Sequence, residues 1–276
     1  MKKKTEVFGV LGPRLRPGIK WARRGLFAAV LLCALTMALI GASNAATIGS
    51  PVFIDYNTRN WSSPSAYGAW SFAIGRYARA NGDNSFAIGA NSYIQNGANN
   101  IAIGYEARVL NNQGGSNVTV EAVALGYKAL VDYGGDMAFG RLAVAKALKA
   151  VAIGTGSNAS GEEAMAVGYS ANAGGKNSLA LGYGAESPLQ NSTAIGYKAR
   201  SVAAGGIAIG ETSLANREGG VTGWVPDSYT GTPSGPAWTA TTGAVSVGND
   251  AAASIRTRQI TGVAAGTYDT DAVNVA

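Results

Sequence analysis

A four-residue phrase that recurs along most of the chain constrains its fold more than any other feature. The phrase reads large apolar residue, alanine, large apolar residue, glycine, as in Phe72-Ala73-Ile74-Gly75, and one copy has Thr193 at its first position. The copies end at Gly75, Gly89, Gly104, Gly126, Gly140, Gly154, Gly168, Gly182, Gly196 and Gly210, with a variant copy at Gly248. From Gly126 to Gly210 the glycines are spaced by fourteen residues. So regular a period is typical of a solenoid, in which each repeat stacks on the next.

The apolar residues of each phrase alternate, which indicates a strand and not a helix. The large side chains share one face of that strand, and the alanine and glycine share the other. A second small residue follows three positions after the glycine, as at Ala171 and Ala185, and polar turn formers fill the remainder. Each repeat therefore predicts a strand, a tight turn, a short strand and a polar turn. We expect an all-β, flattened roll with two short strands per coil.

Three spacings depart from fourteen residues and divide the roll. The repeat glycines are 15 residues apart between Gly89 and Gly104, 22 apart between Gly104 and Gly126, and 38 apart between Gly210 and Gly248. The two long spacings predict loop insertions at residues 109–120 and 211–244. The roll would then span residues 66–250, after an N-terminal segment at 46–65 and before a distinct segment at 251–276.

One coil has too little apolar surface to fold alone. Two buried aliphatic side chains are worth about 1.5–3 kcal/mol each, whereas ordering each backbone residue costs about 1–2 kcal/mol. Small side chains allow close approach, so we expect the alanine and glycine face to pack against neighbouring chains. The predicted trimer and core packing residues are Ala73, Ile74, Ala87, Ile88, Ala152, Ile153, Ala166, Val167, Ala180, Leu181, Ala194, Ile195, Ala208 and Ile209.

The first 45 residues differ from the rest and predict a secretory signal peptide. A basic region precedes an apolar run at residues 26–40, which ends in the small residues Ser43-Asn44-Ala45. A retained N-terminal anchor is the alternative. The segment holds eight of the 22 basic residues and one of the 16 acidic residues, so the remainder has 14 basic and 15 acidic groups. This balance gives no support for nucleic-acid binding. Cys33, the single cysteine, lies in the same segment.

The composition argues against an enzyme. The chain has no histidine, and removal of the signal peptide leaves no cysteine, so the commonest general base and the thiol nucleophile are missing. Adjacent Glu162 and Glu163 read as a solvated pair, and Gly182-Tyr183-Gly184 reads as a repeat turn. The acidic residues form no calcium loop. We therefore expect no catalytic site, no metal site and no cofactor.

Two aromatic features are candidates for recognition. Tyr105, Tyr127, Tyr169, Tyr183 and Tyr197 directly follow repeat glycines. They predict a stacking ladder along the roll, with a ligand-facing strip as the alternative. Trp224 and Trp238 lie in the second insertion, which is rich in Gly, Pro, Ser and Thr. They predict a cap on the last coil, with a ligand-binding loop as the alternative.

The repeated phrase, preceded by Asn-Ser at Asn84-Ser85, Asn177-Ser178 and Asn191-Ser192, resembles the head repeats of YadA-type trimeric autotransporter adhesins. Residues 258–267 and 270–276 resemble the neck of that family and the first turn of its coiled-coil stalk. The resemblance implies a left-handed parallel β-roll, a homotrimer and a C-terminal neck. The predicted neck residues are Arg256, Arg258, Gln259, Ile260, Val263, Asp271 and Val273.

The resemblance also implies a function and a location. It implies a head on the surface of a Gram-negative bacterium that binds host matrix proteins such as collagen or fibronectin, binds cell-surface receptors, or mediates autoaggregation. A C-terminal β-barrel anchor in the outer membrane is implied but does not occur in this sequence, so we expect a fragment of a longer protein, with a released product as the alternative. A structural spacer or self-association module without a host ligand remains the rival function.

Overall fold

The computed structural model describes residues 52–54, 64–110, 121–225, 227–251 and 254–264. All of them belong to one compact unit, Gly49–Ala276. The predicted signal peptide lies outside the described residues, and so do Asp271, Val273 and the predicted start of the coiled coil. Strands are the regular secondary structure of the described part, and no helix is found there.

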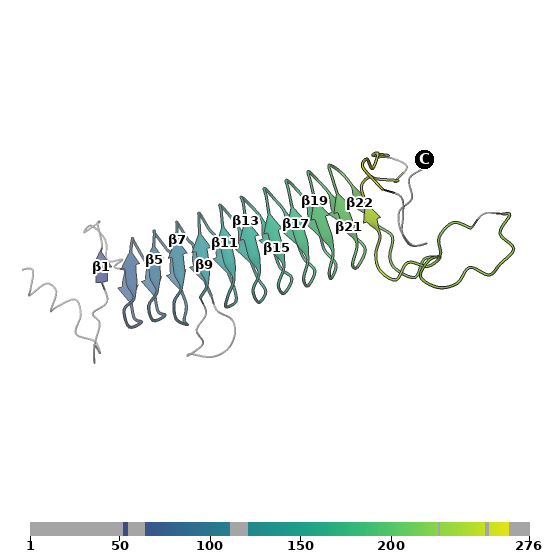
Figure 1. Cartoon of the computed structure of the whole chain (residues 1–276). Helices are drawn as coiled ribbons and strands as arrows, with labels where there is room; N and C mark the ends of the chain where they lie inside the picture. Colours follow the sequence, from purple (N-terminus) through teal and green to yellow (C-terminus); the bar gives the residue numbers. More distant parts are fainter. Residues whose placement is uncertain (1–51, 55–63, 111–120, 226, 252–253, 265–276) are drawn as a thin grey trace, which may run out of the picture. The chain divides into compact units, whose positions relative to one another are not determined.

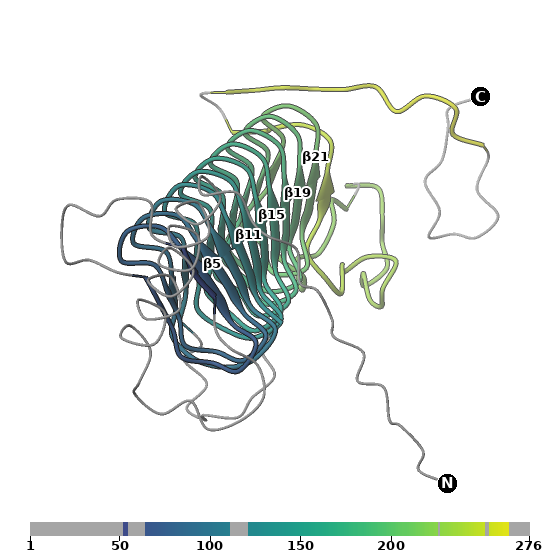
Figure 2. The same cartoon turned by 90° about the vertical axis from the view of Figure 1, so that its left-hand side faces the viewer.

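The repeats form two parallel sheets, and each complete coil contributes one strand to each sheet (Figures 1 and 2). We call the 12-stranded sheet, built from the recurring phrase, sheet A. Its strands are β1 (Val52–Ile54), β3 (Phe72–Ile74), β5 (Phe86–Ile88), β7 (Ile101–Ile103), β9 (Val123–Leu125), β11 (Met137–Phe139), β13 (Val151–Ile153), β15 (Met165–Val167), β17 (Leu179–Leu181), β19 (Thr193–Ile195), β21 (Ile207–Ile209) and β23 (Val245–Ser246).

The 11-stranded sheet, built from the shorter strand of each coil, is sheet B. Its strands are β2 (Ser65–Ala66), β4 (Arg79–Ala80), β6 (Tyr93–Ile94), β8 (Arg108–Val109), β10 (Leu130–Val131), β12 (Val144–Ala145), β14 (Asn158–Ala159), β16 (Asn172–Ala173), β18 (Glu186–Ser187), β20 (Arg200–Ser201) and β22 (Leu214–Ala215). In both sheets each strand pairs with the strand one coil away, so equivalent repeat positions form straight columns, as at Ala152, Ala166 and Ala180. The predicted all-β solenoid with a fourteen-residue period is confirmed.

The interior of the roll is lined mainly by alanine and serine, with Ile94, Val109 and Val131 as its largest apolar side chains. The middle residue of each phrase, exemplified by Ala166, is fully buried inside the single chain. The expectation that the alanine face packs against neighbouring chains is therefore wrong. The large apolar residues of the phrase point outward instead, because the narrow space between the two sheets of a fourteen-residue coil holds few large side chains. Of the predicted packing residues, Ala73, Ala87, Ala152, Ala166, Ala180, Ala194 and Ala208 lie inside, and Ile74, Ile88, Ile153, Val167, Leu181, Ile195 and Ile209 lie on the outer face.

The geometry of the coil explains each residue of the phrase and of the Asn-Ser before it. Asn177 occupies a left-handed turn position with φ of 55°, which asparagine tolerates better than most residues. Ser178 follows and points into the roll. Gly168 ends its phrase with φ of 136°, and a Cβ there would lie 2.4 Å from the carbonyl oxygen of Gly182 in the next coil. Only glycine fits that column.

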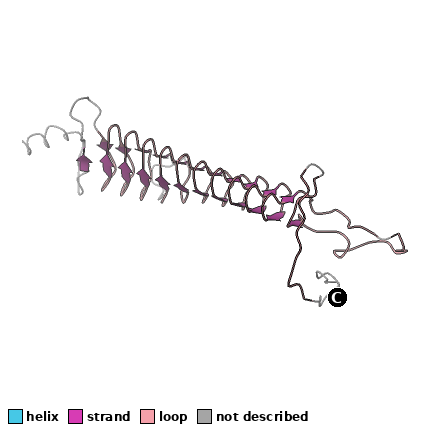
Figure 3. Ribbon diagram, turned by 90° about the horizontal axis from the view of Figure 1, so that it is seen from above, coloured by secondary structure: helices cyan, strands magenta, loops and turns pink. Residues whose placement is uncertain are grey.

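Both insertions begin later than the sequence predicts. Val109 lies in β8 and Leu214–Ala215 form β22, so the shorter strand of each coil is completed before the chain departs. The pairing of β22 with β20 explains the difference, since the last coil gains a second strand by continuing the period. The excursion after β22 leaves the stack of coils and returns at β23 (Figure 3). Residues 111–120 of the first insertion lie outside the described residues.

Candidate binding surfaces

The outer face of sheet A is an apolar surface that is not covered within the single chain. The first and third residues of each phrase point away from the interior, and Phe86, Met137, Met165, Ile103, Ile153, Leu181 and Ile209 are exposed. Thr193 is the one polar side chain in these two columns between β3 and β21. With about 4.8 Å between paired strands, the columns extend for roughly 40 Å. Apolar patches of this extent mark interaction surfaces in soluble proteins.

The outer face of sheet B is chemically different. Polar and charged side chains occupy most of its outward column in the C-terminal half, and they pair between coils. Nδ2 of Asn158 donates to Oδ1 of Asn172 at 2.9 Å, and Nε of Arg200 donates to Oε2 of Glu186 at 2.8 Å. A face that satisfies its own polar groups is suited to water. In its C-terminal half the roll thus has one apolar and one polar side.

The tyrosines that follow the repeat glycines form a ladder along one edge of the roll. Tyr183 stacks between Tyr169 and Tyr197, with ring centroids 5.0 and 5.1 Å away. Tyr105 and Tyr127 stack in the same way at 5.4 Å. The predicted stacking ladder is confirmed, although Arg141 and Thr155 divide it into two parts. The ring faces are occupied by stacking, so the ladder presents ring edges and hydroxyl groups to solvent.

Charged groups near the first part of the ladder stabilise one another. The pKa of Glu106 is lowered, first by the hydrogen bond from Tyr105 and also by the positive charge of Lys128. The same contacts raise the pKa values of Tyr105 and Lys128. Tyr105 and Lys128 are exposed, and Glu106 is partly buried. The directions of these pKa shifts keep Glu106 and Lys128 charged and Tyr105 neutral at neutral pH, so the three groups form a local network.

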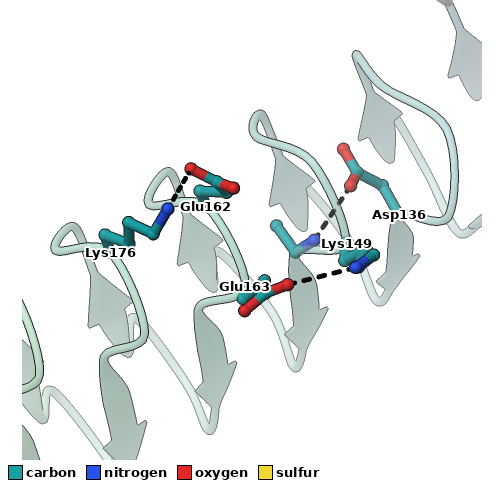
Figure 4. Close-up of polar contacts among 6 residues, drawn as sticks. Asp136, Lys149, Glu162, Glu163 and Lys176 are labelled. Carbon is teal, nitrogen blue, oxygen red and sulfur yellow. Dashed lines mark hydrogen bonds and ion pairs between the residues drawn. The ribbon is translucent and has the colours of Figure 1, made fainter.

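The adjacent carboxylates Glu162 and Glu163 lie at the polar turn on the opposite edge of the coil. Lys176 binds Glu162 at 2.8 Å from the following coil, and Lys149 binds Glu163 at 3.1 Å from the preceding coil (Figure 4). Both pairs are exposed, and such pairs contribute about 0–1 kcal/mol each. The arrangement supports the interpretation of a solvated, structural pair and offers no acid–base dyad.

Asp136 is a buried carboxyl that the sequence did not single out. It lies in the inward column just before β11, where other coils have serine, alanine, glycine or, at Asn100, asparagine, and it has no exposed surface. Its Oδ1 accepts the backbone N–H of Ala150 at 2.9 Å, and its Oδ2 accepts that of Tyr133 at 3.2 Å. Burial raises the pKa of Asp136 to about 7, against the lowering effect of these hydrogen bonds. Burial also raises the pKa of nearby Asp132.

The predicted neck residues take different positions at the end of the roll. Arg258 lies across the turn after Gly210 and donates to Oγ of Ser213 at 3.1 Å and to the carbonyl oxygen of Glu211 at 2.7 Å. Arg256 pairs through its backbone with Asn249 in an antiparallel bridge. Arg258 thus binds the last coil through hydrogen bonds. Gln259 and Ile260 are exposed, and Val263 is partly buried.

The two tryptophans of the second insertion do not cap the last coil. The side chain of Trp224 is 82% exposed. Trp238 packs on Tyr229 inside the insertion, with ring centroids 4.7 Å apart. The end of the roll is covered by β23, which pairs with β21. The predicted cap is wrong for both tryptophans, because the chain returning from the insertion provides this cover with its own backbone.

The described ranges contain no group of three or more His, Cys, Asp or Glu side chains placed to hold a metal ion. In the same part of the chain, no helix has the length and apolar character needed to cross a membrane.

Comparison with known proteins gives two positive results and one negative. The family model described as the YadA head domain repeat matches residues 66–92, 135–157, 159–185 and 190–220. Among solved structures, the crystal structure of the collagen-binding domain of the Yersinia adhesin YadA is similar, with 26% sequence identity and a TM-score of 0.41. It covers 83% of this chain and 95% of its own. No curated protein matches the chain.

The matched segments coincide with coils that keep the fourteen-residue period. The unmatched coils between residues 93 and 134 are those that contain the fifteen-residue spacing and the first insertion. The match therefore follows the same repeat that builds the two sheets. Over these segments the chain is similar to YadA head repeats, which confirms the family resemblance seen in the sequence.

Proposed function

We propose that this chain is the head of a bacterial surface adhesin, which attaches cells to host matrix proteins or receptors or to one another by multivalent contact. The observation that carries the proposal is the match of the YadA head repeat to residues 66–92, 135–157, 159–185 and 190–220, which form coils of the roll. The family resemblance supports three chains side by side, a left-handed roll, a neck that leads to a stalk, and a position at the cell surface. Three copies of a repetitive surface would add avidity to weak contacts.

The outer face of sheet A supports association between copies. Its two columns of large apolar side chains, which include Ile153 and Leu181, are exposed in the single chain. Burying apolar surface is worth about 25 cal/mol per Å², so docking this face on another copy adds stabilisation that the narrow interior cannot provide. The polar outer face of sheet B would then remain in water and carry the contacts with a host ligand such as collagen or fibronectin.

Sedimentation equilibrium of the purified protein tests the association. We expect a trimer, and we expect Ile153→Lys combined with Leu181→Lys to give a monomer that retains its β-sheet circular dichroism. Asn172→Lys, on the outer face of sheet B, is the matched control and should leave the trimer intact. A monomeric wild-type protein, or a double variant that remains trimeric, would contradict the proposed interface.

Binding to immobilised collagen, fibronectin and intact host cells tests the adhesin role. We expect saturable binding of the trimer to at least one of these surfaces and weaker binding of the monomeric variant. The rival role, a structural spacer, is favoured by the inter-coil pairs Lys176–Glu162 and Arg200–Glu186, which leave fewer charges available to a ligand. A trimer that binds none of the surfaces and does not aggregate cells would establish the spacer.

A further inference from the structure

A pocket of about 240 Å³ lies where the last coils of the roll meet the segment after β23. Its lining includes Lys198, Arg200, Thr212, Ser213, Asn249 and Arg256. The lining combines three elements of the chain: strand β20 with the turn before it, the turn before β22, and the bridge between Asn249 and Arg256. The alternating phrase, the glycines and the polar turns that define the repeat do not require cationic side chains at this pocket.

The charges of this pocket are not balanced. All three ionisable side chains in its lining, those of Lys198, Arg200 and Arg256, are cationic. Nε of Arg200 binds Glu186, which compensates one of the three charges. Within the described residues, Lys198 and Arg256 form no ion pair with a carboxylate. Lys198 lies over the ring of Tyr197 at 5.3 Å, and Nη1 of Arg256 donates to the carbonyl oxygen of Ile255 at 3.3 Å. Two positive charges thus remain at the pocket.

A hydroxyl group in the same lining also lacks a partner. Oγ1 of Thr212 is buried and makes no hydrogen bond within the described residues. A buried polar atom without a partner costs about 1–3 kcal/mol, so such atoms mark places where a ligand or water belongs. The neighbouring hydroxyl of Ser213 is already used, since it donates to the carbonyl oxygen of Ile209 and accepts from Arg258. Of these two adjacent hydroxyl groups, that of Thr212 is the one without a hydrogen-bond partner in the described part of the chain.

We propose that this pocket binds a tetrahedral oxyanion, as a sulfate ester or a phosphate ester. Two uncompensated cations attract an anion and form short, charge-assisted hydrogen bonds with it. The donors come from three separate elements, which suits the several oxygen atoms of a tetrahedral group better than the two oxygen atoms of a carboxylate. Lys198 acts as a point charge, the guanidinium groups of Arg200 and Arg256 donate in fixed directions, and Thr212 adds a neutral donor.

Isothermal titration calorimetry of the purified protein with potassium sulfate and with potassium phosphate tests the site, with potassium chloride at equal ionic strength as the reference. We expect one saturable site per chain for sulfate, for phosphate or for both, and none for chloride. A sulfated disaccharide and a phosphate monoester then distinguish the two sources of the oxyanion by their relative affinities. Absence of saturable binding for all four probes would overturn the proposal.

Single substitutions locate the site. We expect Lys198→Gln and Arg256→Gln each to weaken binding about tenfold, as loss of one charge-assisted hydrogen bond predicts, and Thr212→Val to weaken it severalfold. Lys176→Gln is the control, because Lys176 pairs with Glu162 outside the pocket. Equal affinity of the wild type and Arg256→Gln would overturn the assignment. Since Arg256 is exposed, that variant tests the pocket even if Lys198→Gln fails to fold.

Discussion

Replacing Asp136 with asparagine should stabilise the roll above neutral pH and have little effect in mild acid. The carboxyl group has no exposed surface and its pKa is raised to about 7. Between the ordinary value near 4 and about 7, the folded chain binds more protons than the unfolded chain. Stability therefore falls as the pH rises through this window and is lowest above it. The substitution removes the titrating group and with it this loss.

The structure sets the size of the effect. The difference between the ordinary pKa of 3.8 and about 7 corresponds to an upper limit of about 4 kcal/mol, at 1.36 kcal/mol per pH unit. Asparagine loses the bond that Oδ2 accepts from the N–H of Tyr133, which costs about 1–3 kcal/mol. We expect a net gain of about 1–3 kcal/mol at pH 8. At pH 5 the wild-type carboxyl is neutral, so the gain should disappear.

Another coil already carries the substituted side chain. Asn100 lies at the equivalent inward position, where its Oδ1 accepts the N–H of Ala122 at 3.0 Å and its Nδ2 donates to the carbonyl oxygen of Asn96 at 3.2 Å. In the coil of Asp136 the residue four positions earlier, which corresponds to Asn96, is Asp132. The mirror substitution, Asn100→Asp, should therefore introduce the same pH-dependent loss of stability.

Urea unfolding followed by circular dichroism at pH 5, 6, 7 and 8, at one protein concentration, measures the effect. The free energy of unfolding of the variant minus that of the wild type is determined at pH 8 and at pH 5. We expect this difference to be about 2–3 kcal/mol larger at pH 8 than at pH 5. Other titrating groups cancel in this comparison. A difference independent of pH, or a variant less stable than the wild type at pH 8, would refute the argument from burial.

Four further substitutions test the coil geometry, each by urea unfolding. Gly168→Ala should destabilise by at least about 1–3 kcal/mol, because its φ of 136° is unfavourable for alanine and a Cβ meets the next coil. Ala166→Leu should cost about 3 kcal/mol or more, because this residue is fully buried between two sheets; a neutral effect would contradict the narrow interior. Leu142→Asn should raise the free energy of unfolding by at most about 1 kcal/mol, because φ at this exposed turn is 58° and asparagine tolerates a positive φ better than leucine. Tyr183→Leu should cost about 1–2 kcal/mol through two lost stacking contacts, and an unchanged unfolding midpoint would show that the ladder does not stabilise the roll.

The regular part of the fold follows from local properties of the sequence. The fourteen-residue period, the alternation in phrases such as Met165-Ala166-Val167, and the glycine that ends each phrase together predict two short strands per coil and their stacking. These features are local because each coil repeats the same backbone geometry and contacts its neighbours at equivalent positions. The tyrosine ladder follows for the same reason, since a fixed position in the repeat becomes a straight column in the roll.

The candidate sites could not be predicted from the sequence, because they depend on distances between coils. The positive charges of Lys198 and Arg256 are separated by almost sixty residues and meet only because the chain returns to the last coil after its second insertion. Asp136 resembles any other turn aspartate in the sequence, and its pKa depends on burial between neighbouring coils. Trp224 shows the opposite error, since a residue type expected to cap the roll lies in solvent.

The sequence by itself determined that the strands have one small and one large face, but it did not determine which face is inside. Alternation specifies two sides of a strand and contains no information on the distance to the opposite sheet. The tertiary structure decided the question: two turns in each fourteen-residue coil bring the sheets so close that mainly alanine and serine fill the space between them, with a few larger side chains such as Ile94 and Val131. The larger residues of each phrase, such as Ile153, lie on the outside because sheet A turns its alanine column toward this narrow interior.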